Sequence, residues 1–214
     1  MEQFTRILAI RHGETAWNVD TRIQGHTDIP LNDLGRWQAS RVAQGLAGNS
    51  VHAIYSSDLL RAHDTAKAIA LTTGAPLHTV QTLRERQFGV FEGKTFQEIE
   101  RTLPEQARLW RQRDPAFTPE GGESLLMLRD RIESAVTQLA AKHLGQQIVL
   151  VAHGGVMDVL YRLATRQDIQ APRTWLLGNT AINRLLWTPE GLSLVGWADM
   201  RHLDDDTTLD DTTA

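Results

Sequence analysis

Residues 7–13 read Ile-Leu-Ala-Ile-Arg-His-Gly, and residues 148–154 read Ile-Val-Leu-Val-Ala-His-Gly. Each stretch is a short apolar run, typical of a strand buried on both faces, and each ends in a histidine followed by a glycine. In an open α/β sheet the carboxyl ends of parallel strands meet at one edge, where ligands bind. We therefore expect the imidazoles of His12 and His153 to lie together at that edge, with glycines that let a substrate approach the backbone.

The rest of the chain alternates between helical and strand patterns. These patterns and their turn residues predict strands over 51–55 and 76–80 and a hairpin of 181–187 and 192–197. They also predict a helix that Asn32 or Asp33 caps and that runs to about Gly45 or Gly48, helices over about 124–144 and 156–164, and a helix that ends at Gly74. Such alternation predicts the α/β class, as a three-layer α/β/α sandwich with a mostly parallel sheet flanked by helices. The helix-rich stretch 96–113 falls in an insertion of about 94–121, which we expect to form a small helical cap.

Composition is that of one ordinary globular domain. The chain has 214 residues and a mass of 24.0 kDa, with 41% hydrophobic and 22% charged residues. These values suit a single domain over 1–203. The remaining residues, 204–214, include five aspartates and no basic residue, and we expect them to form a flexible acidic tail.

Composition also excludes several classes of function. The net charge of −4 argues against binding to nucleic acid. Cysteine is absent, which rules out disulfides, thiol nucleophiles and cysteine-ligated metals. No apolar stretch is long enough to cross a bilayer, and the first residues give no export signal. We therefore expect no membrane partner and a cytoplasmic location.

Arginine dominates the basic residues, with 19 arginines against 3 lysines. Its planar guanidinium binds oxyanions through two parallel hydrogen bonds. Arg11 adjoins His12, and Arg61 lies in the first turns of the helix after the 51–55 strand, so both can reach the same edge of the sheet. The helix after Gly154 would point its N-terminal N–H groups there as well. Together these groups predict an electropositive pocket for a phosphoryl group.

Three other kinds of site fit the sequence poorly. A zinc site would use HExxH or HxH spacing or cysteines, none of which occurs, and neighbouring arginines would repel a divalent metal, so no metal is expected. Ser56 and Ser57 stand outside a GxSxG elbow, which argues against a serine hydrolase. No GxxxxGK[ST] loop is present, so a P-loop nucleotide enzyme is not expected either.

Several blocks of sequence occur in an order that points to a family. They are Arg11-His12-Gly13-Glu14-Thr15 with Trp17-Asn18 and Gln24-Gly25, then Ser56-Ser57-Asp58-Leu59 with Arg61 and Thr65-Ala66, Leu83-Arg84-Glu85 with Phe88-Gly89 and Glu92-Gly93, Gly122-Glu123-Ser124, and His153-Gly154. In these blocks the chain resembles the histidine phosphatase superfamily, which contains the cofactor-dependent phosphoglycerate mutases and related acid phosphatases. The resemblance runs from residue 6 to about 203. The end of that stretch is similar to the bacterial mutase-like branch of broad-specificity phosphatases. The resemblance implies a phosphoglycerate mutase-like fold.

The resemblance implies the catalytic residues. His12 would be the nucleophile that takes up the phosphoryl group as a phosphohistidine, a role that suits a neutral imidazole. Arg11, Arg61 and His153 would hold the equatorial phosphoryl oxygens and stabilise the charge of an in-line transition state. Glu85 would be the general acid for the leaving oxygen and then the general base for the incoming water.

The same resemblance implies the substrate-binding residues. Asn18 and the N–H of Gly154 would complete the phosphate cradle that begins at Gly13. Gln24 and Gly25 would line its floor. Neither a metal nor another cofactor is implied, because the arginines take the place of a metal. The compound 2,3-bisphosphoglycerate would be needed only by a mutase.

We therefore expect a metal-independent phosphomonoester hydrolase that acts on a small phosphorylated metabolite through a phosphohistidine. The alternative is a phosphoglycerate mutase, but the glycolytic mutases carry a longer, basic lid with paired arginines. Here the 94–121 stretch is short, and its Arg108, Arg111 and Arg113 do not match that pattern. A non-catalytic phospho-ligand binding module is a third interpretation, although such a module would have lost catalytic residues that are all present here. The expected partner is a small phosphomonoester, with a symmetric homodimer as the default assembly.

Overall fold

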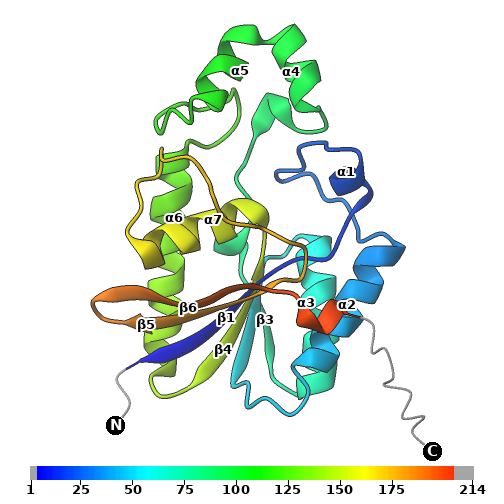
Figure 1. The fold of residues 1–214 in the computed structure, drawn as a ribbon, viewed down its shortest axis with the longest axis vertical. Coiled ribbons are helices and arrows are strands. Elements are labelled where there is room, and N and C mark those ends of the chain that lie inside the picture. The colour runs from blue at the N-terminus through cyan, green and yellow to red at the C-terminus, as the bar shows by residue number, and fades with distance from the viewer. Residues whose placement is uncertain (1–3, 205–214) are drawn as a thin grey trace, which may run out of the picture.

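The central sheet has six strands in the order β3-β2-β4-β1-β5-β6 (Figure 1). The structure is a computed structural model that describes residues 4–204, so the tail expected over 204–214 lies outside the described residues except for Asp204. The strands are β1 (Thr5–Arg11), β2 (Ala53–Ser56), β3 (Leu77–Thr79), β4 (Gln147–Ala152), β5 (Ile182–Thr188) and β6 (Gly191–Asp199). The first four strands pair in parallel, and the β5–β6 hairpin is antiparallel to β1.

Helices cover both faces of this sheet (Figure 1). One face carries α2 (Asp33–Gly45) and α3 (Leu60–Thr73), and the other carries α6 (Leu125–Ala140) and α7 (Gly154–Thr165). The apolar run of β4 follows from this arrangement, because Val149 and Val151 pack with α2 and α3 while Ile148 and Leu150 pack with α6 and α7. The predicted three-layer α/β/α sandwich with a mostly parallel sheet is confirmed.

Local signals in the sequence fix several helix ends. The side chain of Asn32 accepts a hydrogen bond from the backbone N–H of Gly35 and begins α2. Ser124 begins α6 in the same way. Gly74 ends α3 with a φ of 71°, in the left-handed region that favours glycine.

α6 and α7 differ slightly from their predicted ranges. α6 ends at Ala140, and a 3₁₀ turn over Ala141–His143 completes the stretch expected to be helical up to residue 144. α7 begins at Gly154 rather than at residue 156. Glycine is a poor helix former in a helix interior, but the first N–H groups of a helix have no partner within it, so two glycines are tolerated there.

The segment between β3 and α6 forms the helical part at the top of Figure 1. It holds α4 (Phe96–Thr102) and α5 (Pro104–Arg111), and we call residues 94–121 the cap. A small cluster of its own, which includes the buried side chains of Phe91, Ile99 and Ala107, holds the cap together. The carboxyl ends of the parallel strands therefore lie between the body of the sheet and the cap.

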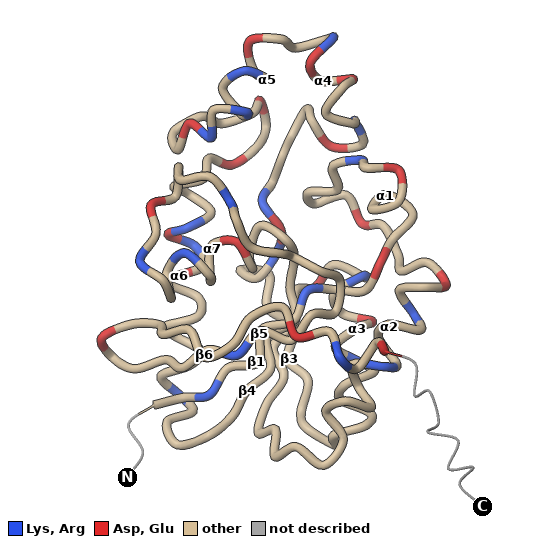
Figure 2. Tube along the Cα trace, in the orientation of Figure 1, with Lys and Arg blue, Asp and Glu red and all other residues tan. Residues whose placement is uncertain are grey.

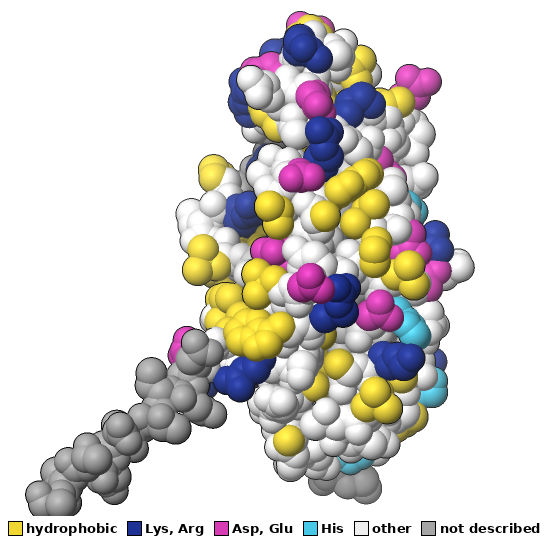
Figure 3. Space-filling model, turned by 90° about the vertical axis from the view of Figure 1, so that its right-hand side faces the viewer, with side chains coloured by type: hydrophobic (Ala, Val, Ile, Leu, Met, Phe, Trp, Pro, Cys, Tyr) yellow, Lys and Arg dark blue, Asp and Glu magenta, His cyan; other side chains and the backbone are white. Residues whose placement is uncertain are grey.

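The outer surface carries a few large apolar side chains. Val19 of α1 (Ala16–Val19) and Leu34 and Trp37 of α2 are exposed. Figure 3 faces the side of the molecule that lies to the right in Figure 1, and it shows hydrophobic side chains interspersed with charged ones. Within the described residues, no helix has the length and apolar character needed to span a membrane.

Candidate active site

The two central strands bring His12 and His153 together. β1 and β4 pair with Arg11 opposite Ala152, and the backbone N–H of His12 donates to the carbonyl oxygen of Ala152 at 3.0 Å. The imidazole centroids of His12 and His153 lie 5.2 Å apart, and both side chains are buried. The parallel register thus places the residues that follow each strand at one edge of the sheet.

His12 has one ring nitrogen free of a proton. Its Nδ1 lies 2.7 Å from the carbonyl oxygen of Gly13. Because a carbonyl oxygen can only accept, Nδ1 carries the proton and Nε2 keeps its lone pair. Burial first, and then the charges of Arg61 and Arg11, lowers the pKa of His12 well below 6.5. The side chain is therefore a neutral imidazole with a fixed tautomer.

His153 is held by Ser57, to which sequence reasoning assigned no role. The Nε2 atom of His153 lies 2.8 Å from Oγ of Ser57, which directly follows β2. Burial, and after it the charge of Arg61, lowers the pKa of His153 well below 6.5. A third parallel strand thus positions the second neutral imidazole.

Arg61 of α3 supplies a fully buried guanidinium. Its Nη1 donates to the carbonyl oxygen of Thr27 at 2.9 Å, and its Nη2 donates to that of Gly25 at 2.8 Å. Its Nε has no hydrogen-bond partner among residues 4–204. Burial is the main cause that lowers the pKa of Arg61 to about 10, so the group stays cationic at neutral pH.

Arg11, the last residue of β1, supplies a second cation. Its Nη1 donates to the carbonyl oxygen of Leu177, while its Nε is buried without a partner in the described part of the chain. Burial is also the main cause that lowers the pKa of Arg11 below its usual value. Buried N–H donors without an acceptor are rare in folded proteins. Arg11 and Arg61 each offer one, which suits an anionic ligand between them.

Glu85 reaches the site from the segment that leads from β3 to the cap. The backbone N–H of Gly155 donates to both carboxylate oxygens, at 3.1 and 3.0 Å. The backbone N–H of Arg86 also donates to Oε1 of Glu85 at 2.7 Å. The guanidinium groups of the two neighbours have other partners, since Nε of Arg84 donates to Asp58 at 2.7 Å and Nε of Arg86 donates to the carbonyl oxygen of Glu123 at 2.7 Å. Glu85 is therefore held at the start of α7 rather than in an ion pair with its neighbours.

A cavity of about 160 Å³ joins these groups. Its walls are Arg11, His12, Asn18, Arg22, Ile23, Gln24, Gly25, Arg61, Glu85 and Phe88. We call it the phosphoryl cavity. Most of the residues predicted for the site line it. His153 does not, although its ring lies 5.2 Å from that of His12. Figure 2 shows basic and acidic positions along the chain segments between the sheet and the cap.

Two of the predicted binding glycines lie outside this wall. Gly13 donates its N–H to Oγ1 of Thr65 at 3.1 Å, and a Cβ there would lie 3.0 Å from Cα of Gly35 and closer still to its carbonyl oxygen. Packing against α2 thus explains the glycine at position 13. Gly154 lines a neighbouring cavity with Gly155. Direct contact of Gly13 and Gly154 with a substrate stays a prediction.

Two further residues support the site, and the sequence assigned no role to either: Asn179 lies outside the quoted blocks, and Glu92 belongs to one of them. Asn179 donates from Nδ2 to the carbonyl oxygen of His12 at 2.8 Å. Glu92 accepts from the backbone N–H groups of His26 and Thr27, both at 3.0 Å, and so fixes the loop that holds Arg61. Single polar residues of this kind are common, and only the fold shows what they contact.

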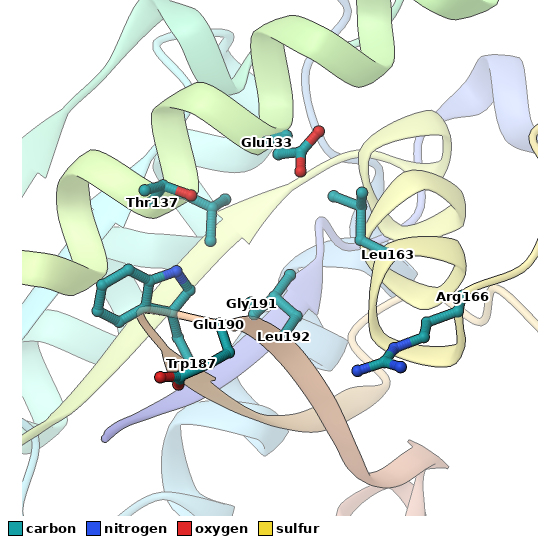
Figure 4. Close-up of a pocket in the computed structure, with 9 residues that line it drawn as sticks. Glu133, Thr137, Leu163, Arg166, Trp187, Glu190, Gly191 and Leu192 are labelled. Carbon is teal, nitrogen blue, oxygen red and sulfur yellow. The ribbon is translucent and has the colours of Figure 1, made fainter. Parts of the chain in front are cut away.

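A separate hollow of about 210 Å³ lies between α6, α7 and the β5–β6 hairpin (Figure 4). Glu133, Arg166 and Trp187 are among its walls, and none of the predicted site residues is. In residues 4–204 no group of three or more histidine, cysteine or acidic side chains is arranged to hold a metal ion. The phosphoryl cavity is therefore the place where the chemically active groups meet.

Comparison with known proteins gives a consistent family. The model of the histidine phosphatase superfamily (branch 1) matches residues 7–200. Phosphoglycerate mutase-like protein 4 of Arabidopsis thaliana is 39% identical over 206 residues, which cover 94% of this chain and 88% of that protein. The metal-independent phosphoserine phosphatase of the same plant is 36% identical over 204 residues, covering 94% and 84%.

A solved structure gives the same fold. The phosphoserine phosphatase of Entamoeba histolytica, in complex with 3-phosphoglyceric acid, superposes with a TM-score of 0.82 at 31% identity. The match covers 94% of this chain and 100% of that one. The phosphoglycerate mutase-like α/β architecture expected from the sequence is therefore confirmed.

Proposed function

The chain belongs to the histidine phosphatase superfamily, and on that premise we propose that it is a metal-independent phosphatase that hydrolyses small phosphomonoesters through a phosphohistidine on His12. One observation carries the proposal. The phosphoryl cavity combines a neutral His12, two arginines whose Nε–H groups are buried without a partner in the described residues, and the carboxylate of Glu85. A nucleophile, anion-binding donors and a proton carrier are the groups that phosphoryl transfer to a side chain needs.

The reaction would proceed in two steps. In the first, Nε2 of His12 attacks phosphorus, the ester P–O bond breaks, and protonated Glu85 gives its proton to the leaving oxygen. In the second, water attacks phosphorus, the N–P bond breaks, and Glu85 takes a proton from the water. Arg11 and Arg61 would bind the equatorial oxygens throughout, so their charge would replace that of a metal.

Hydrolysis is favoured over a mutase reaction. A relative that aligns along almost the whole chain is named as a metal-independent phosphoserine phosphatase, and the similar solved structure is also a phosphatase. The cap is short and carries only α4 and α5. The relative named as mutase-like keeps phosphoglycerate mutase as the weaker alternative.

The test is phosphate release from a panel of phosphomonoesters in the presence of EDTA. We expect turnover of small substrates such as O-phosphoserine and 3-phosphoglycerate, and an acid-labile phosphoenzyme after rapid quenching. His12→Ala should abolish both. His52→Ala should change neither, because His52 precedes β2 and so lies at the opposite end of that strand from the site.

The same assay separates the alternatives. Conversion of 3-phosphoglycerate to 2-phosphoglycerate that is stimulated by 2,3-bisphosphoglycerate and outpaces phosphate release would replace the proposal with a mutase. Phosphate binding in a thermal-shift experiment without turnover of any substrate would indicate a binding module. The cofactor-free reaction, the cytoplasmic location, the homodimer and the single domain over 1–203 remain predictions.

A further inference from the structure

A second cavity, of about 430 Å³, adjoins the phosphoryl cavity and shares Arg11 and Phe88 with it. We call it the leaving-group cavity. Its charged walls are Arg11, Arg86, Arg113, Asp158 and Arg173, and apolar walls such as Leu125 and Trp110 complete it. A phosphomonoester whose phosphorus lies at His12 would extend its alcohol part into a space of this kind.

The leaving-group cavity has an excess of positive charge. Arg173 is exposed, and no acidic side chain among residues 4–204 pairs with it. Its charge contributes to the lowered pKa of both Arg11 and Arg113, as expected where cations converge. Arg86 donates its hydrogen bonds to backbone carbonyl oxygens, so no acidic side chain accepts from it in these bonds. Asp158 is the one acidic wall, so the cavity favours an anion.

Arg113 is held where α5 ends, within the cap. Its φ of 53° is that of the left-handed residue of a Schellman turn, in which the N–H of Arg113 donates to the carbonyl oxygen of Trp110 at 2.9 Å and that of Asp114 donates to Leu109 at 3.1 Å. Nη2 of Arg113 donates to Oδ2 of Asp158 at 3.0 Å and to the carbonyl oxygen of Ile169 at 3.1 Å. Its Nε is buried without a partner in the described chain.

Asp158 does not cancel the charge of the cavity. Arg162, one turn further along α7, also donates to its Oδ2 at 3.0 Å, so two guanidinium groups share one carboxylate. Asp158 thus acts as a positioning residue for Arg113. Its Oδ1 is buried without a partner in the described residues, which leaves one acceptor for a hydroxyl or ammonium group of a ligand.

We propose that the leaving-group cavity binds a carboxylate on the alcohol part of the substrate, with Arg113 and Arg173 as specificity residues. The substrate class is then the phosphomonoesters of small hydroxy acids. This inference rests on the proposed function, because it places the phosphorus at His12. A guanidinium with a free N–H pairs with a carboxylate through charge-assisted hydrogen bonds, which are the strong ones.

Two pairs of substrates that differ in one carboxylate test the inference. They are O-phosphoserine with O-phosphoethanolamine, and 3-phosphoglycerate with glycerol 3-phosphate. We expect kcat/KM to be about 10- to 100-fold higher for the carboxylated member of each pair. Arg113→Gln and Arg173→Gln should each reduce that ratio by about tenfold. Arg108→Gln removes an exposed charge of the same cap, paired with Glu105, and should leave the ratio unchanged.

The outcomes separate this inference from the proposed function. Turnover with equal kcat/KM within both pairs, or an unchanged ratio in Arg173→Gln, would overturn the carboxylate assignment and leave the phosphatase in place. No phosphate release from any of the four substrates would overturn the proposed function itself. Arg173 decides the test if Arg113→Gln fails to fold, because its side chain is exposed and its loss breaks no ion pair among residues 4–204.

Discussion

At the scale of single residues, the site depends on imidazoles that their surroundings keep neutral. His12 and His153 are buried, and the charge of Arg61 lowers the pKa of each. Protonation of either ring would place a positive charge beside two arginines. It would also place that charge where water cannot hydrate it, so the neutral form is favoured. The cations that would bind a phosphoryl group therefore also keep His12, the proposed nucleophile, in the form that can attack.

We predict that both imidazoles remain neutral as the pH falls through 6.5, the ordinary value for histidine. The unfolded chain takes up these protons near that pH and the folded protein does not, so the unfolded state binds more protons. The free energy of unfolding should therefore fall as the pH drops below about 6.5, and less so in His12→Gln. Imidazole NMR and urea unfolding would measure this. A midpoint near 6.5 for His12 would contradict it.

Glu85 offers a second prediction at this scale. Glu85→Gln removes the proton that an alkoxide leaving group needs, so turnover of O-phosphoserine should fall by about 10²- to 10⁴-fold. p-Nitrophenyl phosphate should be affected far less, because its leaving group is stable as an anion. Glu133→Gln, on the exposed side of α6, is the matched control. An equal loss on both substrates would remove Glu85 from the role of general acid.

At the scale of elements, the position of His12, the proposed nucleophile, depends on how the end of β1 packs against the start of α2. The backbones of residues 13 and 35 are in contact, with no room for a Cβ at either position. Gly13→Ala would push α2 away from the strand end. The ring of His12 would move as well, because its Nδ1 is hydrogen-bonded to the carbonyl oxygen of Gly13.

We therefore predict that Gly13→Ala lowers the free energy of unfolding by about 1–3 kcal/mol, the usual cost of overpacking. Chemical denaturation would measure it. Gly196→Ala is the control, since a Cβ at Gly196 meets nothing within 4 Å and its φ lies outside the left-handed region. Equal stability of the Gly13 variant and the control would show that α2 can shift at little cost.

Element patterns explain what the sequence could and could not predict. The apolar runs of β1 and β4 predict burial on both faces, and parallel pairing then requires their following histidines to share an edge. The same rule places Ser57, which follows β2, at that edge, but it does not show that Oγ of Ser57 lies within hydrogen-bond distance of Nε2 of His153. Glu85 shows the same limit. Local sequence favours an ion pair with Arg84 or Arg86, whereas the fold brings the N–H of Gly155 to its carboxylate.

At the scale of the whole molecule, the cap has a hydrophobic core separate from those between the sheet and its covering helices. Large clusters on both faces of the sheet support β1 and β4. The cap has only a small cluster around Phe91. His12, the proposed nucleophile, therefore stands on the better supported part, while Arg113 and Trp110, which line the leaving-group cavity, belong to the part with fewer buried contacts. Such a region opens locally at lower free energy than the sheet.

Trp110 is the side chain through which this difference can be measured. It stacks on Phe91 with centroids 5.2 Å apart and meets Phe96 edge-on at 5.4 Å. Trp110→Ala should cost the cap about 2–3 kcal/mol, less than for a fully buried tryptophan. Amide exchange in α4 and α5 should then accelerate about 30- to 100-fold, while exchange in β1 and β4 stays unchanged.

Trp37→Ala, at an exposed position of α2, should leave the exchange of the cap unaltered. Equal acceleration in the sheet and the cap of Trp110→Ala would mean that the two open as one unit. The cap could then not adjust to a leaving group without disturbing His12. Acceleration confined to the cap would instead allow α4 and α5 to close on a substrate while Arg113 stays bound to Asp158 and the sheet edge holds His12, the proposed nucleophile, in place.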